Sequence, residues 1–356
     1  IIFKGNDGGS AITALTLDMS DAGAATFNSN ITIGSTSAGG SLILFDNGQI
    51  LLYNANDDKR YRIRNSGSAA NTLVFEANDN SDILTLDESG NATFSGTING
   101  IPFFSEAAHN SMYTHDVSGQ TNTAQYNTAY GFAALDAITT GDQNTVIGYE
   151  AGSAINSASG SVAIGYQALR LEDTYGYNTA VGFRALKNQN SDGVTYNVAV
   201  GYASQESVVS GRYNVSIGGE ALYTNSDGDN NTALGYKALK SFEADTGGHG
   251  NNVAVGANAA QNMSTGTENV AIGQNAMGEG VTTGNYNVAV GYRAGEDLTS
   301  GGQNTSLGSF ALMNALTGAA NVTIGYGAMS NADGSESKNV AVGYNALNEM
   351  NNSTDN

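Results

Sequence analysis

Asn178-Thr179-Ala180-Val181-Gly182-Phe183-Arg184-Ala185-Leu186 is the stretch that decides the fold, because the chain repeats its pattern thirteen times between residues 127 and 347. Another clean copy runs from Asn339 to Leu347. Every copy has a glycine at the place of Gly182, and successive glycines are 17 to 21 residues apart, most often 17. A short and nearly constant period of this kind is typical of a solenoid, in which each repeat forms one coil. The motif glycines are Gly131, Gly148, Gly165, Gly182, Gly201, Gly218, Gly235, Gly256, Gly273, Gly291, Gly308, Gly325 and Gly343.

The residues around the glycine are almost as regular, and we number them from it. Position −3 is always Thr or Val, position −1 is Val, Ile or Leu except for Tyr130, and position +3 is Ala except for Ser204. Position −4 is Asn in twelve copies, with Ser161 as the exception. A column of stacked asparagines predicts a ladder of hydrogen-bonded side-chain amides. These asparagines are Asn127, Asn144, Asn178, Asn197, Asn214, Asn231, Asn252, Asn269, Asn287, Asn304, Asn321 and Asn339.

The alternation inside the motif predicts a β-strand. Positions −3 and −1 point to one side of a strand, and Asn, Ala and Gly point to the other. A 17-residue coil has room for two strands of about five residues and two turns. The motif glycine predicts the first turn, and the variable stretch, with sequences such as Thr140-Gly141-Asp142, predicts the second. Tyr or Phe at position +1 in nine copies predicts an aromatic ladder.

The small residues of the motif predict a flat coil with little interior. We therefore expect the stripe of positions −3 and −1 to be buried outside the coil, together with the leucines at position +4, such as Leu169, Leu186, Leu239 and Leu347. Three chains around one axis would bury such a stripe along its whole length, although composition also allows a single-chain β-helix. The predicted fold class is all-β: an elongated homotrimeric fibre with an N-terminal shaft and a parallel β-roll or β-solenoid of about thirteen coils.

The N-terminal third reads differently from the repeats. Leu15-Thr16-Leu17-Asp18 followed by Ala25-Thr26-Phe27 returns as Leu84-Thr85-Leu86-Asp87 followed by Ala92-Thr93-Phe94. Between them, residues 42–45 and 50–53 flank Asp46-Asn47-Gly48, which is a hairpin signal. We predict a β-rich shaft at 1–100, a neck at 101–125 and the repeat domain at 126–356.

Composition excludes several classes of protein. The 356 residues carry a formal charge of −20, which argues against nucleic acid as a partner because clustered Lys and Arg would have to neutralise the phosphates. The chain has no cysteine, and therefore neither a disulfide framework nor a thiolate metal site. No apolar run reaches the roughly 18 residues of a membrane span. We expect no cofactor.

Two segments of the repeat region resemble known families. Ser161-Val162-Ala163-Ile164-Gly165 and Asn197-Val198-Ala199-Val200-Gly201 resemble the head repeats of trimeric autotransporter adhesins of the YadA type, which implies left-handed parallel β-rolls packed as trimers. The longer form with a period near 17 resembles phage tail-fibre proteins and related proteins of marine bacteria. The Leu-Thr-Leu-Asp units look like tail-fibre shaft sequence, which favours the phage. The period departs from that of the shorter adhesin repeat.

Three groups of residues are candidates for chemistry. The histidines His109, His115 and His249 follow no metal-ligand spacing, although one histidine per chain on a trimer axis would give three ligands. The acidic turn from Asn225 to Asp229 could offer oxygen ligands to Ca²⁺, but it lacks the calcium-loop spacing. Alternation in the segment Lys59–Arg64 places Arg60, Arg62 and Arg64 on one face, where a solvated strand face competes with a binding patch.

No catalytic motif occurs in the sequence, and we expect a protein that is not an enzyme. The predicted function is a structural trimeric fibre or adhesin of a phage tail, located in the virion, that presents or mediates attachment to the host surface. Its expected partners are itself, other tail or baseplate proteins, and a host-surface glycan or protein. The alternatives are a bacterial trimeric autotransporter adhesin on the cell surface, an ice-binding solenoid, and a capsule depolymerase with carboxylate pairs across chains.

Overall fold

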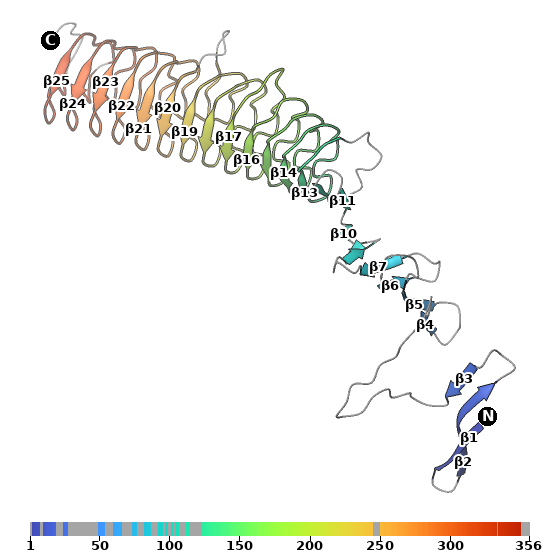
Figure 1. Cartoon of the computed structure of the whole chain (residues 1–356). Coiled ribbons are helices and arrows are strands. Elements are labelled where there is room, and N and C mark those ends of the chain that lie inside the picture. The colour runs from blue at the N-terminus through green and yellow to red at the C-terminus, as the bar shows by residue number, and fades with distance from the viewer. Residues whose placement is uncertain are drawn as a thin grey trace. The chain divides into compact units, whose positions relative to one another are not determined.

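We describe a computed structural model of the chain, and Figure 1 shows it with its strands labelled. The structure describes residues 2–7, 10–18, 24–27, 49–53, 60–65, 73–76, 82–86, 92–94, 97–98, 101–102, 104–106, 111–113, 123–244, 250–332 and 334–349. Across these residues every regular element is a β-strand and none is a helix, so the all-β prediction is confirmed. The chain divides into two compact units, Ile1–Gly96 and Thr97–Asn356.

The first unit consists of two antiparallel meanders. One has the order β1-β2-β3 and the other β4-β5-β6-β7-β8. The two similar sequence units form matching hairpins, because Leu15 pairs with Phe27 in the first and Leu84 pairs with Phe94 in the second. The strands are β1 (Ile2–Asp7), β2 (Ser10–Asp18), β3 (Ala24–Phe27), β4 (Gln49–Tyr53), β5 (Arg60–Asn65), β6 (Leu73–Glu76), β7 (Asp82–Leu86) and β8 (Ala92–Phe94).

The predicted hairpin around Asp46-Asn47-Gly48 falls partly outside the described residues, which exclude its first arm, residues 42–45. Its second arm lies in β4, whose described partner is β5. The second unit begins with two short antiparallel pairs, β9 (Thr97–Ile98) with β10 (Ile101–Pro102) and β11 (Phe104–Glu106) with β12 (Ser111–Tyr113). β12 then pairs in parallel with the first solenoid strand, and a separate neck at 101–125 stays a prediction.

The repeats form a parallel β-solenoid with one strand per coil, and the strands lie side by side from β13 to β25 (Figure 1). Equivalent positions pair in every coil, as Thr179, Ala180 and Val181 do with Val198, Ala199 and Val200. The strands are β13 (Thr128–Tyr130), β14 (Thr145–Ile147), β15 (Val162–Ile164), β16 (Thr179–Val181), β17 (Val198–Val200), β18 (Val215–Ile217), β19 (Thr232–Leu234), β20 (Val253–Val255), β21 (Val270–Ile272), β22 (Val288–Val290), β23 (Thr305–Leu307), β24 (Val322–Ile324) and β25 (Val340–Val342).

The motif glycine ends each strand because no other residue fits there. Its φ angle lies between 129° and 140° in all thirteen copies, a region that side chains with a Cβ rarely adopt. The next coil also approaches closely: a Cβ on Gly256 would lie 2.7 Å from the carbonyl carbon and oxygen of Gly273. The glycine column therefore sets both the turn and the tight stacking of the coils.

The rest of each coil is built from turns, so the prediction of two five-residue strands per coil is wrong for the described residues. Each strand has three residues, and the chain returns through left-handed residues at positions +2 and +4 and at position −5 of the next coil. In one coil these are Arg184 (φ 55°), Leu186 (φ 48°) and Tyr196 (φ 50°). Each such residue interrupts the extended conformation that a second strand would need.

The interior of the solenoid is filled by the coil itself. Position −2 and position +3 are buried throughout the middle coils, as Ala180 and Ala185 are. The leucines at position +4 were predicted to need burial outside the coil, and this is wrong: Leu169, Leu186 and Leu239 are fully buried within it. The left-handed conformation at this position allows the side chain to turn inward. Leu347 is 39% exposed because it lies in the last described coil.

Candidate interaction surface

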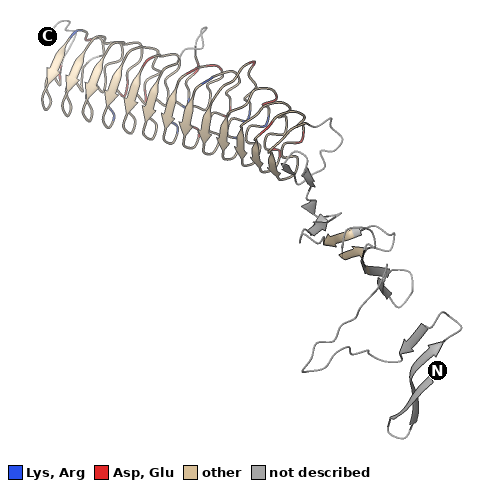
Figure 2. Cartoon of the chain, viewed as in Figure 1, with Lys and Arg blue, Asp and Glu red and all other residues tan. Residues whose placement is uncertain are grey.

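The outward side of the thirteen solenoid strands is the candidate site. Positions −3, −1 and +1 form this outward strand face, and none of their 39 residues is charged. Figure 2 shows the solenoid strands free of charged residues, which lie in the connecting segments. Large apolar side chains are exposed on the face, including Ile217 (46%), Leu307 (47%) and Val342 (63%). A long, uncharged and largely apolar surface of this kind is a candidate for an interaction site.

Aromatic side chains border the outward strand face on both sides. At position +1, Phe132, Tyr149, Tyr166, Phe183 and Tyr202 stack with ring centroids 5.0 to 5.7 Å apart and nearly parallel planes. This is the aromatic ladder that the sequence predicted, although Gly219, Ala257, Gln274 and Ser309 interrupt it further along.

A second aromatic column occupies position −5, at the opposite border of the face. Tyr177, Tyr196 and Tyr213 stack with centroids 5.6 and 5.9 Å apart. All three have positive φ angles and are about half exposed. This column is hard to recognise in the sequence, because tyrosine occurs at position −5 in only five of the copies: Tyr126, Tyr177, Tyr196, Tyr213 and Tyr286.

Charged residues gather instead on the turn edge, which we define as positions +2 to +5. Arg170 pairs with Glu150 at 3.2 Å and Lys240 with Glu220 at 2.6 Å, in each case between consecutive coils. Arg293 pairs with Glu296 within its own coil. The Arg170–Glu150 and Lys240–Glu220 pairs are partly exposed and contribute little to stability. The charges of the turn edge therefore lie at positions +2 and +5, whereas positions +3 and +4 are buried in the coil in most copies.

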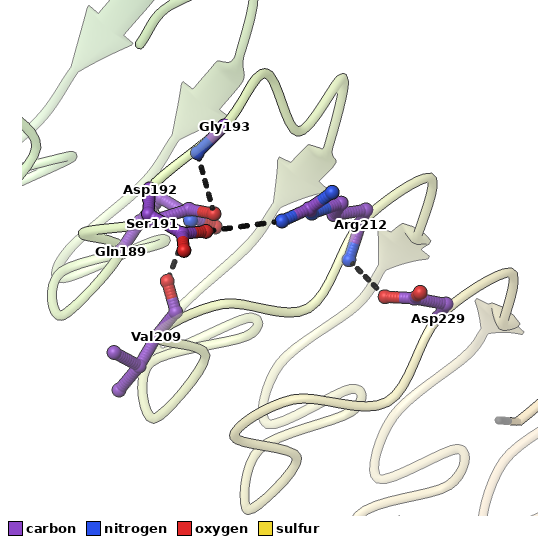
Figure 3. Close-up of polar contacts among 7 residues, drawn as sticks. All are labelled: Gln189, Ser191, Asp192, Gly193, Val209, Arg212 and Asp229. Carbon is purple, nitrogen blue, oxygen red and sulfur yellow. Dashed lines mark hydrogen bonds and ion pairs between the residues drawn. The ribbon is translucent and has the colours of Figure 1, made fainter. Parts of the chain in front are cut away.

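The variable edge, between position +6 and the next position −5, is also held by polar contacts (Figure 3). The side chain of Arg212 contacts Asp192 at 3.2 Å, and its backbone N–H donates to Asp229 at 2.7 Å. Gln189, which is buried, donates through Nε2 to the carbonyl of Val209 at 2.7 Å. These contacts join one coil to the next where the coils differ most in length.

The acidic turn considered for Ca²⁺ already uses its oxygens within the chain. Asn225 accepts from the backbone N–H of Gly228 at 2.9 Å and donates to the carbonyl of the same residue. Asp229 accepts from the backbone of Arg212, and Asp227 accepts from Ser226 at 3.3 Å. In the described part of the chain, no three His, Asp or Glu side chains gather as a possible metal site.

The other candidates from the sequence are only partly visible. His109, His115 and His249 lie outside the described residues. Arg60, Arg62 and Arg64 lie in β5, at alternate register positions opposite Tyr53, Leu51 and Gln49. They belong to the first unit, whereas the outward strand face belongs to the second.

The asparagines at position −4 form a continuous hydrogen-bonded column inside the solenoid. The Oδ1 atom of each accepts the backbone N–H of the next column residue, with distances such as 2.9 Å from Asn269 to Asn252. The Nδ2 atom usually donates to the carbonyl three residues before the next column residue, as Asn287 does to Gly301 at 2.9 Å. From Asn231 onward, neighbouring amides also contact each other directly, with Asn304 donating to Asn287 at 3.0 Å.

One coil interrupts this column, and it also contains a buried carboxyl group that the sequence pattern did not predict. Ser161 replaces Asn, and its Oγ accepts from the backbone of Asn178 at 3.5 Å. In the same coil Glu172 is 2% exposed, at a position where most coils bury an apolar residue such as Ile155 or Phe242 and two bury the uncharged amides of Gln189 and Asn225. Both of its oxygens accept from Nδ2 of Asn178, at 2.9 and 3.0 Å. Burial raises the pKa of Glu172 to about 8, against the lowering effect of that hydrogen bond.

Fold and surface together define a parallel β-solenoid with an outward apolar strand face. The chain matches no protein-family model, no curated protein and no solved structure in the three comparisons made. The described part of the chain holds no helix with the length and hydropathy of a membrane span.

Proposed function

We propose that this chain is a structural, non-catalytic fibre protein that associates with two further copies of itself through the outward strand face. The observation that carries the proposal is that all 39 residues at positions −3, −1 and +1 of the thirteen coils are uncharged in a chain of net charge −20. At about 25 cal/mol for each Å² of apolar surface, covering such a face contributes substantially to stability. If the outward strand face stayed exposed to water, it would promote nonspecific aggregation.

A second copy fits this face better than an unrelated protein does. The face has the same columns in every coil, and strands β13 to β25 are paired in one continuous register. A parallel copy therefore presents the same columns at the same spacing along the whole length. When the chains are parallel, one border of the face on each copy contacts the opposite border of the face on the next copy. Three such contacts form a closed ring of three copies.

The setting we propose for this fibre is a phage tail, where it would present or mediate attachment to the host surface. The support is the resemblance of the Leu-Thr-Leu-Asp units to tail-fibre shafts, together with the matching hairpins that these units form. Antibodies against the solenoid should label the tails of virions. Labelling of a bacterial surface with no virions present would contradict the phage setting. It would not contradict the proposal that the chain forms a fibre.

The oligomeric state tests the fibre proposal directly. Light scattering of the purified chain should give three times the protomer mass of 36.5 kDa. A particle with the mass of one protomer, at concentrations of tens of micromolar, would overturn the proposal.

A charge on the face should separate the copies. Ile272, at position −1, is 39% exposed, so Ile272→Lys should abolish the trimer while circular dichroism keeps its β-sheet signal. The matched control is Gln261→Lys, which adds the same charge on the turn edge of the preceding coil and should leave the trimer intact. Equal effects of the two variants would place the contact elsewhere.

A further inference from the structure

The interior of the solenoid becomes polar between two adjacent coils, which we name after their motif glycines, Gly201 and Gly218. Besides the asparagine column, positions −2, +3, +4 and +7 point inward in these coils. At each of the four, one of the two coils has an apolar residue and the other a fully buried polar one. The pairs are Ala199 and Ser216, Ser204 and Ala221, Gln205 and Leu222, and Val208 and Asn225. In the sequence, no other two adjacent coils have a polar residue at all four positions, so we call this contact the polar junction.

The buried apolar residues form separate clusters on the two sides of the polar junction. One cluster extends from Ala124 to Val208, and the next extends from Ala221 to Leu298. A later cluster follows after another gap, but between the two coils at that gap Ser306 is the one polar residue at the four positions. The Gly201 and Gly218 coils are therefore joined by less apolar contact than their neighbours are.

The polar residues of the junction satisfy one another only in part. Gln205 donates through Nε2 to the hydroxyl of Ser216 at 2.7 Å and to the carbonyl of Val198 at 2.9 Å. The hydroxyls of Ser204 and Ser216 share a hydrogen bond. The Oε1 atom of Gln205 is buried and has no hydrogen-bond partner among the described residues. A buried acceptor without a partner favours separation of the coils, because it gains a bond to water when they part.

Two kinds of contact on the outside of the solenoid also stop at the polar junction. The position +1 ring stack ends at Tyr202, because Gly219 follows it in the next coil. On the turn edge, Glu206 pairs with two bases of the preceding coil, and Glu220 pairs with one base of the following coil. The carboxylates on either side of the junction therefore form their ion pairs away from it.

The backbone ladder and the asparagine column cross the polar junction without a break. Val198 pairs with Val215 in the same register as in the other coils, and the N–H of Asn214 donates to Oδ1 of Asn197 at 2.8 Å. One pair of stacked tyrosines also spans the junction. The junction therefore keeps the backbone contacts of the other coils and lacks part of their side-chain contacts.

We propose that the solenoid consists of two cooperatively folding blocks that meet at the polar junction, and that the coils part there while both blocks remain folded. In a stack of repeats each coil contacts only its neighbours, so the contacts between two coils determine how easily they separate. The junction gives a long solenoid one defined place to open. This inference concerns contacts within one chain and does not depend on the trimer.

Hydrogen exchange of the full chain, in its native oligomeric state, tests the proposal without any substitution. The N–H groups of Gly218 and Glu220 donate across the polar junction, each at 2.8 Å. Their equivalents between two coils with an apolar interior are the N–H groups of Gly273 and Asn275, which donate at 2.8 and 3.0 Å. After correction for intrinsic rates, we expect the first pair to exchange at least about tenfold faster. Equal corrected rates for the two pairs would overturn the proposal.

Restoring the repeat motif at the polar junction should join the two blocks. The variant Ser204→Ala with Gln205→Leu and Ser216→Ala removes the connected polar side chains together. Leucine fits the new position, because Leu186 and Leu222 have the same left-handed conformation as Gln205. In urea, residues 127–208 and 221–298 of the wild type should lose protection from exchange at different concentrations, and those of the triple variant at one concentration.

The matched control is Ser207→Ala, which removes a hydroxyl from the same coil at position +6 and should leave the two steps unchanged. A wild type whose two blocks lose protection at the same urea concentration would contradict the proposal. So would a triple variant that keeps its β-sheet circular dichroism and still unfolds in two steps.

Discussion

The inner and outer sides of the same thirteen strands differ in whether their side chains find partners within the chain. Inside, the asparagine column and the alanines are buried, and Asn252 finds partners at Asn269 and Gly266. On the outer side, the neighbouring side chains of Val253 and Val255 carry no polar group and therefore form no hydrogen bonds. The inner side is therefore satisfied by stacking within one chain, whereas the outer side is the one on which we propose that a second copy packs. Changes inside should lower the stability of the coil, and changes outside should lower association.

The largest effect should come from the glycine that separates the two sides. Gly256→Ala forces a Cβ to within 2.7 Å of the Gly273 carbonyl at a φ of 133°. We expect a loss of about 3 kcal/mol in the free energy of unfolding, measured in urea, with faster hydrogen exchange in β20 and β21. The control Gly193→Ala should cost little, since its Cβ meets only the flexible end of Arg212 at 3.4 Å.

The second effect should come from the inner polar column. Asn252→Ala removes the acceptor for the N–H of Asn269 and the donor to Gly266 and leaves both partners buried. We expect a loss of roughly 2 to 3 kcal/mol, because an unpaired buried group costs more than the bond contributes. Asn262→Ala, on an exposed contact to Glu279, should change unfolding by less than about 0.5 kcal/mol. Equal losses in urea would refute the importance of the column.

The third prediction concerns Glu172, a buried acid on the inner side of the coil. The pKa of Glu172 is raised to about 8 from its ordinary value of 4.5, mainly by burial. The folded state therefore holds a proton that the unfolded state releases, so its contribution to stability is complete below pH 4.5 and is lost as pH rises to about 8. We expect a loss of about 2 kcal/mol between pH 5 and pH 7, which Glu172→Gln should remove.

Hydrogen exchange of the coils around β15 and β16 at several pH values measures this. Glu296→Gln is the comparison at a second buried acid: burial raises the pKa of Glu296 as well, but Arg293 beside it lowers that pKa, so the pH dependence of its coil should be smaller than that around Glu172. A wild-type coil that exchanges at the same corrected rate at pH 5 and pH 8 would contradict the prediction for Glu172.

The smallest effect should come from two neighbouring alanines with opposite backbone conformations. Ala133 has a φ of 53°, whereas Ala134 is fully buried outside the left-handed region. Ala133→Gly should stabilise by about 0.5 kcal/mol, because glycine relieves the left-handed strain at some cost in entropy. Ala134→Gly should destabilise by about 1 kcal/mol. Thermal unfolding of both variants compares them, and shifts of the same sign would argue against the strain.

The sequence predicts the repeat period and the side of the strand on which most residues of the motif lie. The invariant glycine, the β-branched residue at position −3 and the small residue at position −2 predict a stacked strand whichever copy is taken, as in Asn197–Gly201. The buried carboxyl of Glu172 could not be read in this way, although Ser161 in the same coil marks that coil as different. Its surroundings come from residues of neighbouring coils, which local alternation does not reveal.

The sequence by itself determined the all-β class, the parallel stacking and the uncharged outward face, because each follows from a pattern that recurs every 17 residues or so. Only the tertiary structure decided that each coil has one strand and that Leu186 turns inward. Its left-handed φ of 48° is unfavourable for leucine alone and is imposed by the hydrogen bonds and packing of the coils on either side. This left-handed conformation is stable only when the coils are stacked. The sequence of a single repeat therefore does not predict it.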